Sequence, residues 1–229
     1  MADPTQSLLV LGASRGLGLG MTKEFLARGW AVVATSRGSS EGLAELKTRH
    51  PDRLRLETLD INDPAAARYL ASGLGDKRVT ILFVNAGVVD DKRPADQSEI
   101  DEFTRLMTTN ALSPIRMIEI FAPLLATPGV IGVMSSGLGS VTNNTGGGWD
   151  VYRASKAALN TLLRSRAARH REGPAHLAIA PGWVRTDMGG PTASLDVATA
   201  MRGVADVLIS RIGSSTCEYL DYKGSAVAW

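Results

Sequence analysis

Short apolar runs recur along the chain, and most of them end at a glycine, a serine or another turn-forming residue. Runs of this kind are typical of strands buried inside a sheet. They predict about seven strands, which lie within SLLVLGAS (7–14), WAVVATSR (30–37), LRLETLD (54–60), VTILFVNAG (79–87), GVIGVMSS (129–136), AHLAIAPGWV (175–184) and EYLDY (218–222).

The stretches between these runs have the pattern of amphipathic helices. Asp63 can cap the third helix because its carboxylate can accept hydrogen bonds from free backbone N–H groups, and Pro64 fits the first turn. Ser98 can cap the fourth, a long helix that Pro114 is expected to bend. The predicted helices lie at residues 18–29, 41–49, 63–74, 98–126, 151–171 and 195–210.

Strands therefore alternate with helices through the whole chain. This order is typical of a parallel sheet whose two faces are covered by helices. We expect an α/β fold, a doubly wound Rossmann-type parallel sheet of about seven strands. No repeat, low-complexity tract or interior linker divides the sequence, so a single domain over residues 1–229 is expected.

Composition and charge narrow the classes of function. A hydrophobic content of 44% is ample for a packed core, and a net charge of +2 with dispersed Lys and Arg argues against nucleic-acid binding. No apolar run reaches membrane-spanning length, and the polar start MADPTQ is unlike a secretory signal. The single cysteine, Cys217, cannot form an internal disulfide, which suits a reducing compartment. We expect a cytoplasmic protein with no nucleic-acid or membrane partner.

The three histidines give no sign of a metal site. His50, His170 and His176 lack the spacing of metal ligands and fall at predicted helix ends or a strand start. We expect surface or capping roles for them, and no bound metal.

A glycine cluster joins the first strand to the first helix. Gly12, Gly16 and Gly18 lie in GASRGLG (12–18), where backbone N–H groups at a helix N-terminus can approach a dinucleotide pyrophosphate. A glycine cluster alone could also be a simple tight turn, so its place between strand and helix carries the prediction. The spacing is Gly-x3-Gly-x-Gly, which differs from the commoner Gly-x-Gly-x2-Gly.

Together with other segments, this spacing resembles the short-chain dehydrogenase/reductase family. The further segments occur in the family's order and cover nearly the whole chain: NAG (85–87), Asn110, SS (135–136), YRASK (152–156) and PGWVRTDM (181–188). Three features resemble the subgroup of Sniffer-type carbonyl reductases and C-factor-like proteins: the run from SSGLGS (135–140) to YRASKAALN (152–160), the segment PGWVRTDMGG (181–190) and the terminal Trp229.

Tyr152 and Lys156 are four residues apart, so they share one helix face, about 6 Å apart along its axis. An ammonium beside a phenol favours the phenolate, and we expect a lowered tyrosine pKa, as suits a proton donor. The resemblance implies that Tyr152 exchanges the proton, that Lys156 tunes it and holds the nicotinamide ribose, and that Ser136 binds the substrate oxygen. It also implies that the backbone of Asn110 binds a water connecting Lys156 to solvent.

The resemblance further implies a bound cofactor. Asp60, beside Ile61, matches the acid that contacts adenine, and Thr186 matches a contact to the nicotinamide carboxamide. The residues implied to bind the cofactor are Gly12, Ser14, Arg15, Gly16, Leu17, Gly18, Ser36, Arg37, Asp60, Ile61, Asn85, Ala86, Gly87, Tyr152, Lys156, Pro181, Gly182, Val184 and Thr186.

The end of the second predicted strand indicates which dinucleotide is bound. NAD-selective relatives commonly carry an acid there, whereas this chain has Thr35, Ser36 and Arg37. Arg15 in the glycine turn adds a second cation, and a guanidinium suits a phosphate because its planar fork forms paired hydrogen bonds. We therefore expect NADP(H); the alternative is that both arginines are solvated surface residues.

Two positions depart from the family's pattern. Leu11 stands where the glycine motif normally begins with threonine, so a hydroxyl that would tie the turn to nearby backbone is absent. The interval from Ser136 to Tyr152 is also longer than usual, with extra residues in TNNTGGGW (142–149). Ser140 is therefore the alternative to Ser136, which we prefer because it directly ends the fifth strand.

The substrate side is expected to be open near PGWVRTDM, because few residues separate Met188 from the next helix. The glycines of NNTGGGW (143–149) could hinge a lid, with Trp149 as its apolar surface. Trp149 could equally pack permanently against the sheet edge. We expect Leu138, Trp149, Trp183 and Met188 to line an apolar substrate pocket.

The sequence thus predicts an NADPH-dependent carbonyl reductase acting on a small aldehyde or ketone. The alternative is a C-factor-like signalling protein that binds a dinucleotide with little turnover. Leu159, Leu162 and Leu163 on the catalytic helix could join two copies in a homodimer, although a helix also needs such residues for its own core.

Overall fold

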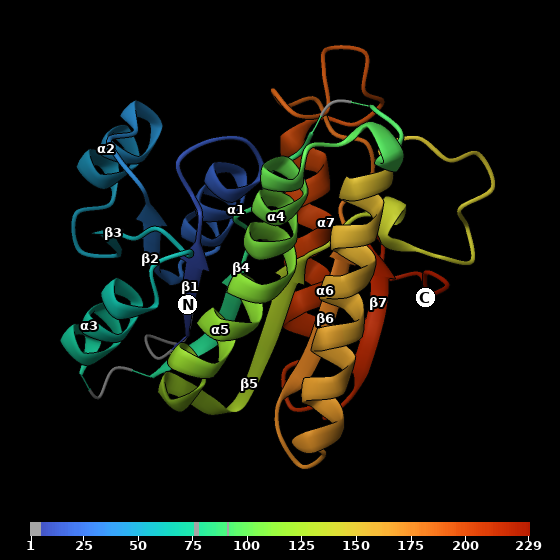
Figure 1. The fold of residues 1–229 in the computed structure, drawn as a ribbon. Coiled ribbons are helices and arrows are strands. Elements are labelled where there is room, and N and C mark those ends of the chain that lie inside the picture. The colour runs from blue at the N-terminus through green and yellow to red at the C-terminus, as the bar shows by residue number, and fades with distance from the viewer. Residues whose placement is uncertain (1–5, 76–77, 91) are drawn as a thin grey trace.

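The computed structural model of the protein describes residues 6–75, 78–90 and 92–229 (Figure 1). The start of the chain, MADPTQ (1–6), which is not expected to be a secretory signal, lies outside these ranges except for Gln6. Within them, no helix combines the length and the apolar composition that crossing a bilayer requires.

The core of the fold is a parallel sheet of seven strands in the order β3-β2-β1-β4-β5-β6-β7 (Figure 1). The order reverses between β1 and β4, which makes this the switch point of a doubly wound sheet. The strands are β1 (Ser7–Leu11), β2 (Ala31–Ser36), β3 (Leu54–Thr58), β4 (Val79–Val84), β5 (Leu125–Met134), β6 (Ala175–Ala180) and β7 (Cys217–Asp221). The expected fold class is confirmed.

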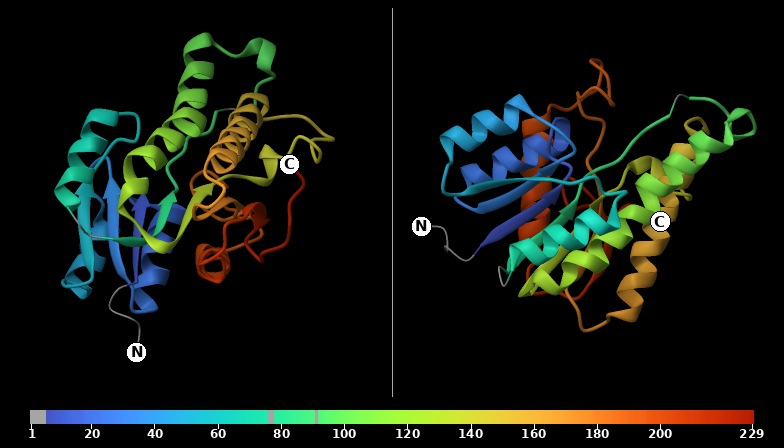
Figure 2. Two further views of the ribbon diagram at one scale, coloured as in Figure 1. Left: turned by 90° about the horizontal axis from the view of Figure 1, so that it is seen from below. Right: turned by 60° about the vertical axis from the view of Figure 1, so that its left-hand side comes forward.

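Helices cover both faces of the sheet (Figure 2). The longer ones are α1 (Gly16–Ala27), α2 (Glu41–Arg49), α3 (Pro64–Leu74), α4 (Ile100–Met107), α5 (Ser113–Phe121), α6 (Asp150–Arg169) and α7 (Val197–Ser210). Buried side chains of α1, α2 and α7 form one hydrophobic cluster with the sheet, and those of α3, α5 and α6 form a second. Central strands such as β4 and β6 are buried along their whole length because both faces are covered.

Several helix starts follow directly from the sequence. The Asp63 side chain accepts hydrogen bonds from the N–H groups of Ala65 and Ala66, both 2.9 Å away, and Pro64 occupies the first turn of α3. Asp196 caps α7 in the same way through the N–H of Thr199. These side chains satisfy N–H groups that have no partner inside the helix.

The long helix predicted at 98–126 is wrong as a single element. Ser98 does not cap it: α4 begins at Ile100 after Glu99, and its first residue has no side-chain cap. A π-helical turn at Thr108–Leu112 interrupts the helix before α5, and β5 already begins at Leu125. Pro114 explains the interruption because it has no N–H to donate to the carbonyl of Asn110, four residues earlier.

His176 also corrects the sequence prediction. It is not a surface residue but a buried one in β6, 1% exposed, and its Nε2 lies 2.6 Å from the Arg166 guanidinium. Burial and the neighbouring Arg166 charge lower the pKa of His176 to about 4. Every residue of β6 is buried, so a side chain at this position lies in the interior, and the buried Arg166 is its polar partner.

Candidate active site

The carboxyl ends of parallel strands meet at one edge of a sheet, and the predicted site residues gather there. Gly12 follows β1, Asn85 follows β4, Ser136 follows β5 and Pro181 follows β6. The switch point between β1 and β4 lies within this edge, where ligands of doubly wound folds bind.

The glycine turn is packed so closely that Gly12 and Gly18 leave no room for side chains. A Cβ on Gly12, whose φ is +92°, would lie 2.7 Å from the Cβ of Ala86. One on Gly18 would lie 2.1 Å from the carbonyl oxygen of Gly12. Close approach therefore requires glycine at both positions, and at Gly12 the backbone conformation requires it as well.

Thr35 supplies the hydroxyl that Leu11 lacks. The N–H of Gly12 donates to Thr35 Oγ1 at 3.1 Å, and the N–H of Ala13 donates to the Thr35 carbonyl at 2.7 Å. The expected loss of a tie between the turn and neighbouring backbone is therefore wrong, because the neighbouring strand provides it. Thr35 lies opposite Leu11 in the β1–β2 register, and this pairing is the signal that could have identified it.

The N-terminus of α1 is suited to an anion. Arg15 precedes the helix without forming a side-chain cap, and the first turn contains no acidic residue. By contrast, α2, α3 and α7 are capped by Ser40, Asp63 and Asp196. The first N–H groups of α1 thus keep the capacity to bind a pyrophosphate, so the glycine turn fits the dinucleotide that its sequence implies.

Asn85 and Asn110 fix the turn that follows β4. Asn85 Nδ2 donates to the Gly12 carbonyl at 2.7 Å and so joins this turn to the glycine turn. Asn110, fully buried in the π-helical turn, bonds the N–H and the carbonyl of Val88, each at 2.8 Å. A Cβ on Gly87 would lie 3.2 Å from Asn110 Oδ1 and 3.3 Å from Lys156 Nζ, so the three residues lie together.

Ser155 is a site residue that sequence reasoning missed. Its side chain is fully buried, accepts a hydrogen bond from Asn110 Nδ2 at 2.9 Å and donates to the Tyr152 carbonyl at 2.8 Å. It therefore links the π-helical turn to α6 at the position of Tyr152. Its only sequence signal was a small polar residue directly beside Lys156.

Tyr152 and Ser136 are brought together by α6 and the end of β5. Tyr152 is 8% exposed, and burial raises the pKa of its phenol to about 12, while a hydrogen bond from Ser136 acts in the opposite direction. The expectation of a lowered tyrosine pKa is therefore wrong for the protein's own groups, since desolvation outweighs them. The phenol stays protonated at neutral pH, as a proton donor must.

Lys156 lies beneath this tyrosine. It is 3% exposed, its Nζ donates to the Met134 carbonyl at 2.8 Å, and the same atom lies 5.8 Å from the centre of the Tyr152 ring. Burial lowers the pKa of Lys156 to about 8. The ammonium thus lies under the ring, on the side of β5, and it loses its proton at a lower pH than an ordinary lysine does.

Ser136 rather than Ser140 faces the tyrosine. Tyr219 of β7 donates its hydroxyl proton to the Ser136 carbonyl, and the Ser136 Oγ accepts from the N–H of Leu138 at 3.2 Å. Ser140 instead accepts from the N–H of Asn143 at 3.1 Å and donates to the Trp229 carbonyl. The alternative serine therefore serves the loop and the C-terminal segment.

The residues expected to contact the adenosine lie at the ends of β2 and β3. Ser36 donates to the Gly38 carbonyl at 2.7 Å, and Arg37 is exposed. Asp60 is half-buried and accepts from the N–H of Asn62 at 2.9 Å, while Ile61 belongs to the hydrophobic core. In the glycine turn, the Ser14 carbonyl accepts from Ser40, and Leu17 packs against the core.

The segment after β6 folds back onto the glycine turn. Pro181 and Val184 are buried, and Gly182, with φ +84°, has no room for a Cβ beside Leu195. The Thr186 Oγ1 accepts from the N–H of Gly189 at 3.1 Å, and its Cγ2 lies 3.6 Å from a Cβ placed on Gly16.

The expected substrate pocket is only partly assembled. Leu138 and Trp149 pack in one hydrophobic cluster with Tyr152, together with Leu106, Val88, Val89 and Val151. Trp183 and Met188 are outside this cluster and are 56% and 47% exposed. The loop after β4, which contributes Val88 and Val89, was missed because these residues lie just beyond the predicted strand VTILFVNAG (79–87) and carry no motif.

The loop before α6 is anchored at its end. Arg153 donates to the carbonyls of Gly148 and Gly147, at 2.7 and 3.2 Å, and Lys92 lies 5.4 Å above the Trp149 ring. The rest of the loop, from Val141 to Gly148, is exposed, and Figure 1 shows it in yellow projecting away from the sheet. Trp149 itself has the left-handed φ of +57°.

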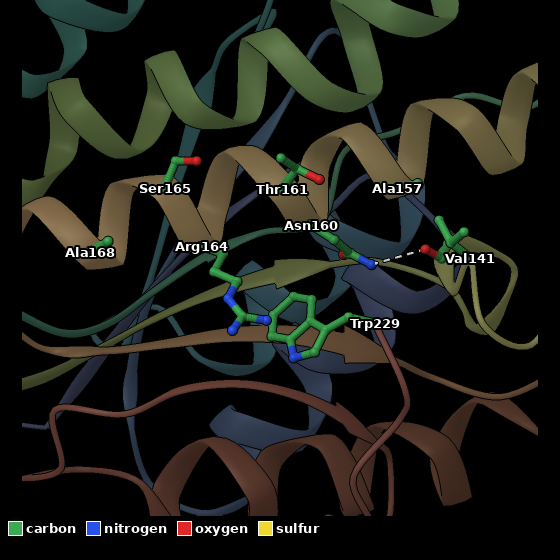
Figure 3. Close-up of a pocket in the computed structure, with 9 residues that line it drawn as sticks. Val141, Ala157, Asn160, Thr161, Arg164, Ser165, Ala168 and Trp229 are labelled. Atoms are coloured by element: carbon green, nitrogen blue, oxygen red, sulfur yellow. Dashed lines mark hydrogen bonds between the residues drawn. The ribbon is translucent and has the colours of Figure 1, made fainter.

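A separate groove lies between α6 and Trp229 (Figure 3). It has a volume of about 370 Å³ and is open to solvent. Trp229 forms one wall, where the Arg164 guanidinium lies 5.2 Å from its ring (Figure 3). Neither Tyr152 nor Lys156 lines this groove, so it is distinct from the candidate active site.

Comparisons with known proteins identify the family of the chain. A sequence profile described as short chain dehydrogenase matches residues 6–195. C-signal of Myxococcus xanthus is 34% identical over 165 residues, which cover 71% of this chain and 99% of that protein.

Two solved structures are similar over almost the whole chain. A protein from Burkholderia multivorans described as a short-chain dehydrogenase/reductase, with bound NADP, has 48% identity and a TM-score of 0.95, and the match covers 98% of this chain and 99% of that one. The carbonyl reductase Sniffer of D. melanogaster has 28% identity and a TM-score of 0.88, covering 97% and 99%. With the glycine turn, the Ser136–Tyr152 pair and Lys156 at one edge of the sheet, the chain belongs to the short-chain dehydrogenase family.

Proposed function

We propose that the protein is an NADPH-dependent carbonyl reductase that converts an aldehyde or ketone into an alcohol. The observation that carries the proposal is the position of Lys156, whose buried ammonium lies 5.8 Å from the centre of the Tyr152 ring, at the edge of the sheet where Ser136 follows β5. A purely structural role would not require a buried phenol, serine and lysine beside a glycine turn. The NADP and NADPH bound in similar structures support the choice of cofactor.

In this proposal, Tyr152 is the proton donor. Bound NADPH supplies the hydride that reduces the carbonyl carbon. The Ser136 hydroxyl holds the carbonyl oxygen beside the phenol, and Tyr152 transfers its proton to that oxygen as negative charge develops there. The raised pKa keeps the phenol protonated until this moment.

Lys156 then stabilises the phenolate and helps to replace its proton. Its ammonium lies next to Gly87 and Asn110, within the group of residues that joins α6 to the π-helical turn. Pro114 withholds the usual helical donor from the Asn110 carbonyl, which leaves that oxygen able to accept from a water. The proton therefore passes from solvent to Lys156 and from Lys156 to Tyr152.

Arg15 and Arg37 select the phosphorylated dinucleotide. Both guanidinium groups are exposed next to the ends of β1 and β2, and no carboxylate stands at Thr35–Arg37. We expect Arg37→Ala and Ser36→Asp each to shift the preference from NADPH toward NADH, measured as the ratio of kcat/KM values. Equal use of both cofactors by the unsubstituted protein would contradict this part of the proposal.

A panel screen tests the activity itself. Purified protein is mixed with NADPH and a set of aliphatic and aromatic aldehydes and ketones, and the loss of absorbance at the reduced nicotinamide band is followed. We expect turnover with at least one class of carbonyl, and alcohol formation confirmed by chromatography. Binding of NADPH without turnover on any carbonyl would reject the proposal.

The second candidate is a signalling protein that binds a dinucleotide but turns over little, which the similarity to C-signal favours. Such a protein needs the glycine turn but gains nothing from a proton donor. The buried Tyr152 with Lys156 beside its ring therefore favours the reductase. The same panel separates the two candidates, because only the reductase consumes NADPH.

A homodimer remains part of the proposal. Leu159 and Leu163 are buried in the chain's own core, which leaves Leu162, 38% exposed on α6, as the outward leucine of that group. Leu112 and Phe103, on the neighbouring π-helical turn and α4, are also exposed. Light scattering that gives the monomer mass would reject the dimer.

A further inference from the structure

We propose that Asp187 competes with the 2′-phosphate of NADPH for the guanidinium of Arg15, and that it thereby limits how strongly the protein prefers NADPH over NADH. This inference rests on the proposed function, because it concerns the same cofactor site. It assigns a specificity role to an acidic residue of the segment after β6.

The first observation is an ion pair across the site. Arg15 Nη1 donates to Asp187 Oδ2, which joins residues 172 positions apart in the sequence. Arg15 is the residue immediately before α1, and Asp187 belongs to the segment that follows β6. Both side chains are about three-quarters exposed, at 74% and 76%, so either can exchange its partner for one from solvent.

The second observation is that the segment presents Asp187 in a defined place. Trp183 Nε1 donates to the Gly189 carbonyl at 2.7 Å, and the N–H of Gly190 donates to the Thr186 carbonyl at 2.8 Å. Thr186 itself lies against Gly16, the first residue of α1. The carboxylate is therefore held beside the helix start that the cofactor would approach.

The chemistry of the guanidinium makes the two partners exclusive. An arginine binds a carboxylate or a phosphate through the same fork of N–H groups, and a phosphate dianion attracts it more strongly. When Arg15 turns the Nη1 group that contacts Asp187 to a 2′-phosphate, it must leave Asp187. Breaking the ion pair with Asp187 therefore lowers the affinity for NADPH. It does not lower the affinity for NADH, because NADH lacks this phosphate.

The size of the effect follows from the exposure of the pair. Exposed ion pairs shift an equilibrium by up to about fivefold. We expect Asp187→Asn to raise the affinity for NADPH by about two- to fivefold and to leave the affinity for NADH almost unchanged. The ratio of the two affinities then rises by the same factor, and added salt reduces the gain.

The experiment measures binding by calorimetry, without turnover. The probes are NADPH and NADH, together with 2′,5′-ADP and 5′-AMP, which differ by the 2′-phosphate alone. Asp187→Asn is compared with Asp206→Asn, which removes an equal charge from an acid that is paired with Arg28. Each change at position 187 is repeated in an Arg15→Ala background.

Tighter binding of NADPH and 2′,5′-ADP by Asp187→Asn alone, abolished in the Arg15→Ala background, supports competition. An equal gain for NADH and 5′-AMP, or the same gain in both backgrounds or from Asp206→Asn, means simple charge repulsion and overturns the inference. Unchanged NADPH affinity in Asp187→Asn overturns this inference alone. A protein that binds neither NADPH nor 2′,5′-ADP overturns the proposed function together with it.

Discussion

Two glycine-rich stretches precede helices of the candidate site, and the same residue serves a different purpose in each. In the turn before and within the start of α1, a Cβ on Gly12 or Gly18 would overlap other backbone atoms. In the loop before α6, a Cβ on Gly146, Gly147 or Gly148 would meet no atom within 4 Å. Packing therefore excludes side chains from Gly12 and Gly18. In the second stretch only the positive φ of Gly147 and Gly148 favours glycine.

The difference reflects how each helix contributes to the site. The start of α1 offers backbone N–H groups, so side chains are excluded and the turn is closely packed. The start of α6 offers the side chains of Tyr152 and Lys156, so the loop before it needs only to deliver the helix. Glycine content alone therefore does not separate the two roles; the space around each glycine does.

The largest effect is expected where α6 acts through a side chain. Tyr152→Phe removes the proton but keeps the buried ring, so turnover falls by about 10² to 10⁴-fold. NADPH affinity, measured by calorimetry, stays close to that of the unsubstituted protein because the α1 turn is untouched. Turnover within a few fold of normal would show that Tyr152 is not the proton donor.

The next effect compares the two glycine stretches directly. Gly18→Ala places a methyl group against the Gly12 carbonyl, so we expect a loss of about 3 kcal/mol or more in the free energy of unfolding and weaker NADPH binding. Gly146→Ala is the matched control, with no atom within 4 Å of the new carbon; we expect a change within about 0.5 kcal/mol. Urea denaturation and calorimetry measure both. Equal losses in the two variants would end the distinction.

A substitution of Lys156 tests whether burying its ammonium lowers the stability of the protein. At pH 7, Lys156→Met removes a buried ammonium, and we expect the free energy of unfolding to rise by about 1–3 kcal/mol while turnover is lost. The pKa of this lysine is lowered from 10.5 to about 8 in the folded protein, so the cost is complete below pH 8. It declines as the pH rises from 8 to 10.5, because only the unfolded chain then still binds the proton.

Denaturation at pH 7 and at pH 10 therefore gives a smaller difference between the variant and the unsubstituted protein at the higher pH. A difference that stays constant or grows with pH would mean that burial of the lysine charge is not its cause.

The smallest effect concerns Trp149, which connects the open loop to the tyrosine cluster. Trp149→Ala removes apolar surface beside Tyr152, and we expect KM for a bulky aromatic ketone to rise by about 3- to 10-fold. KM for a small aldehyde changes less, and NADPH binding does not change. Equal changes for both substrates, or lower thermal stability with normal kinetics, would support a structural tryptophan and reject the lid.

Most of the fold follows from the sequence because each strand is a compact apolar run between turn-forming residues. The periodicity also gave α2 its observed bounds, and Asp63 with Pro64 marked the start of α3. The long helix before β5 was misjudged because helical periodicity continues smoothly through a π turn. Nothing local signals the extra residue of that turn except Pro114, which was interpreted as a bend.

The candidate site was predictable where function depends on residue type and spacing, as for Tyr152 and Lys156. It was not predictable where a partner comes from elsewhere in the chain. Thr35 replaces a missing hydroxyl from the neighbouring strand, and Asp187 approaches Arg15 from the segment after β6. The pKa of Tyr152 was misjudged for a related reason, because the desolvation that raises it depends on packing in three dimensions.

Tyr219, close to the C-terminal end of the chain, holds a residue of the candidate site that is synthesised much earlier. The glycine turn, Ser136, Tyr152 and Lys156 all leave the ribosome before this tyrosine, yet its hydroxyl holds the Ser136 carbonyl. The carbonyl of Trp229, ten residues after Tyr219, accepts a hydrogen bond from the N–H of Val141, in the loop after Ser136. A growing chain can therefore form β1 to β4 before the contacts that hold Ser136 and the loop after it exist. The proposed reductase activity would then require β7 and the segment after it.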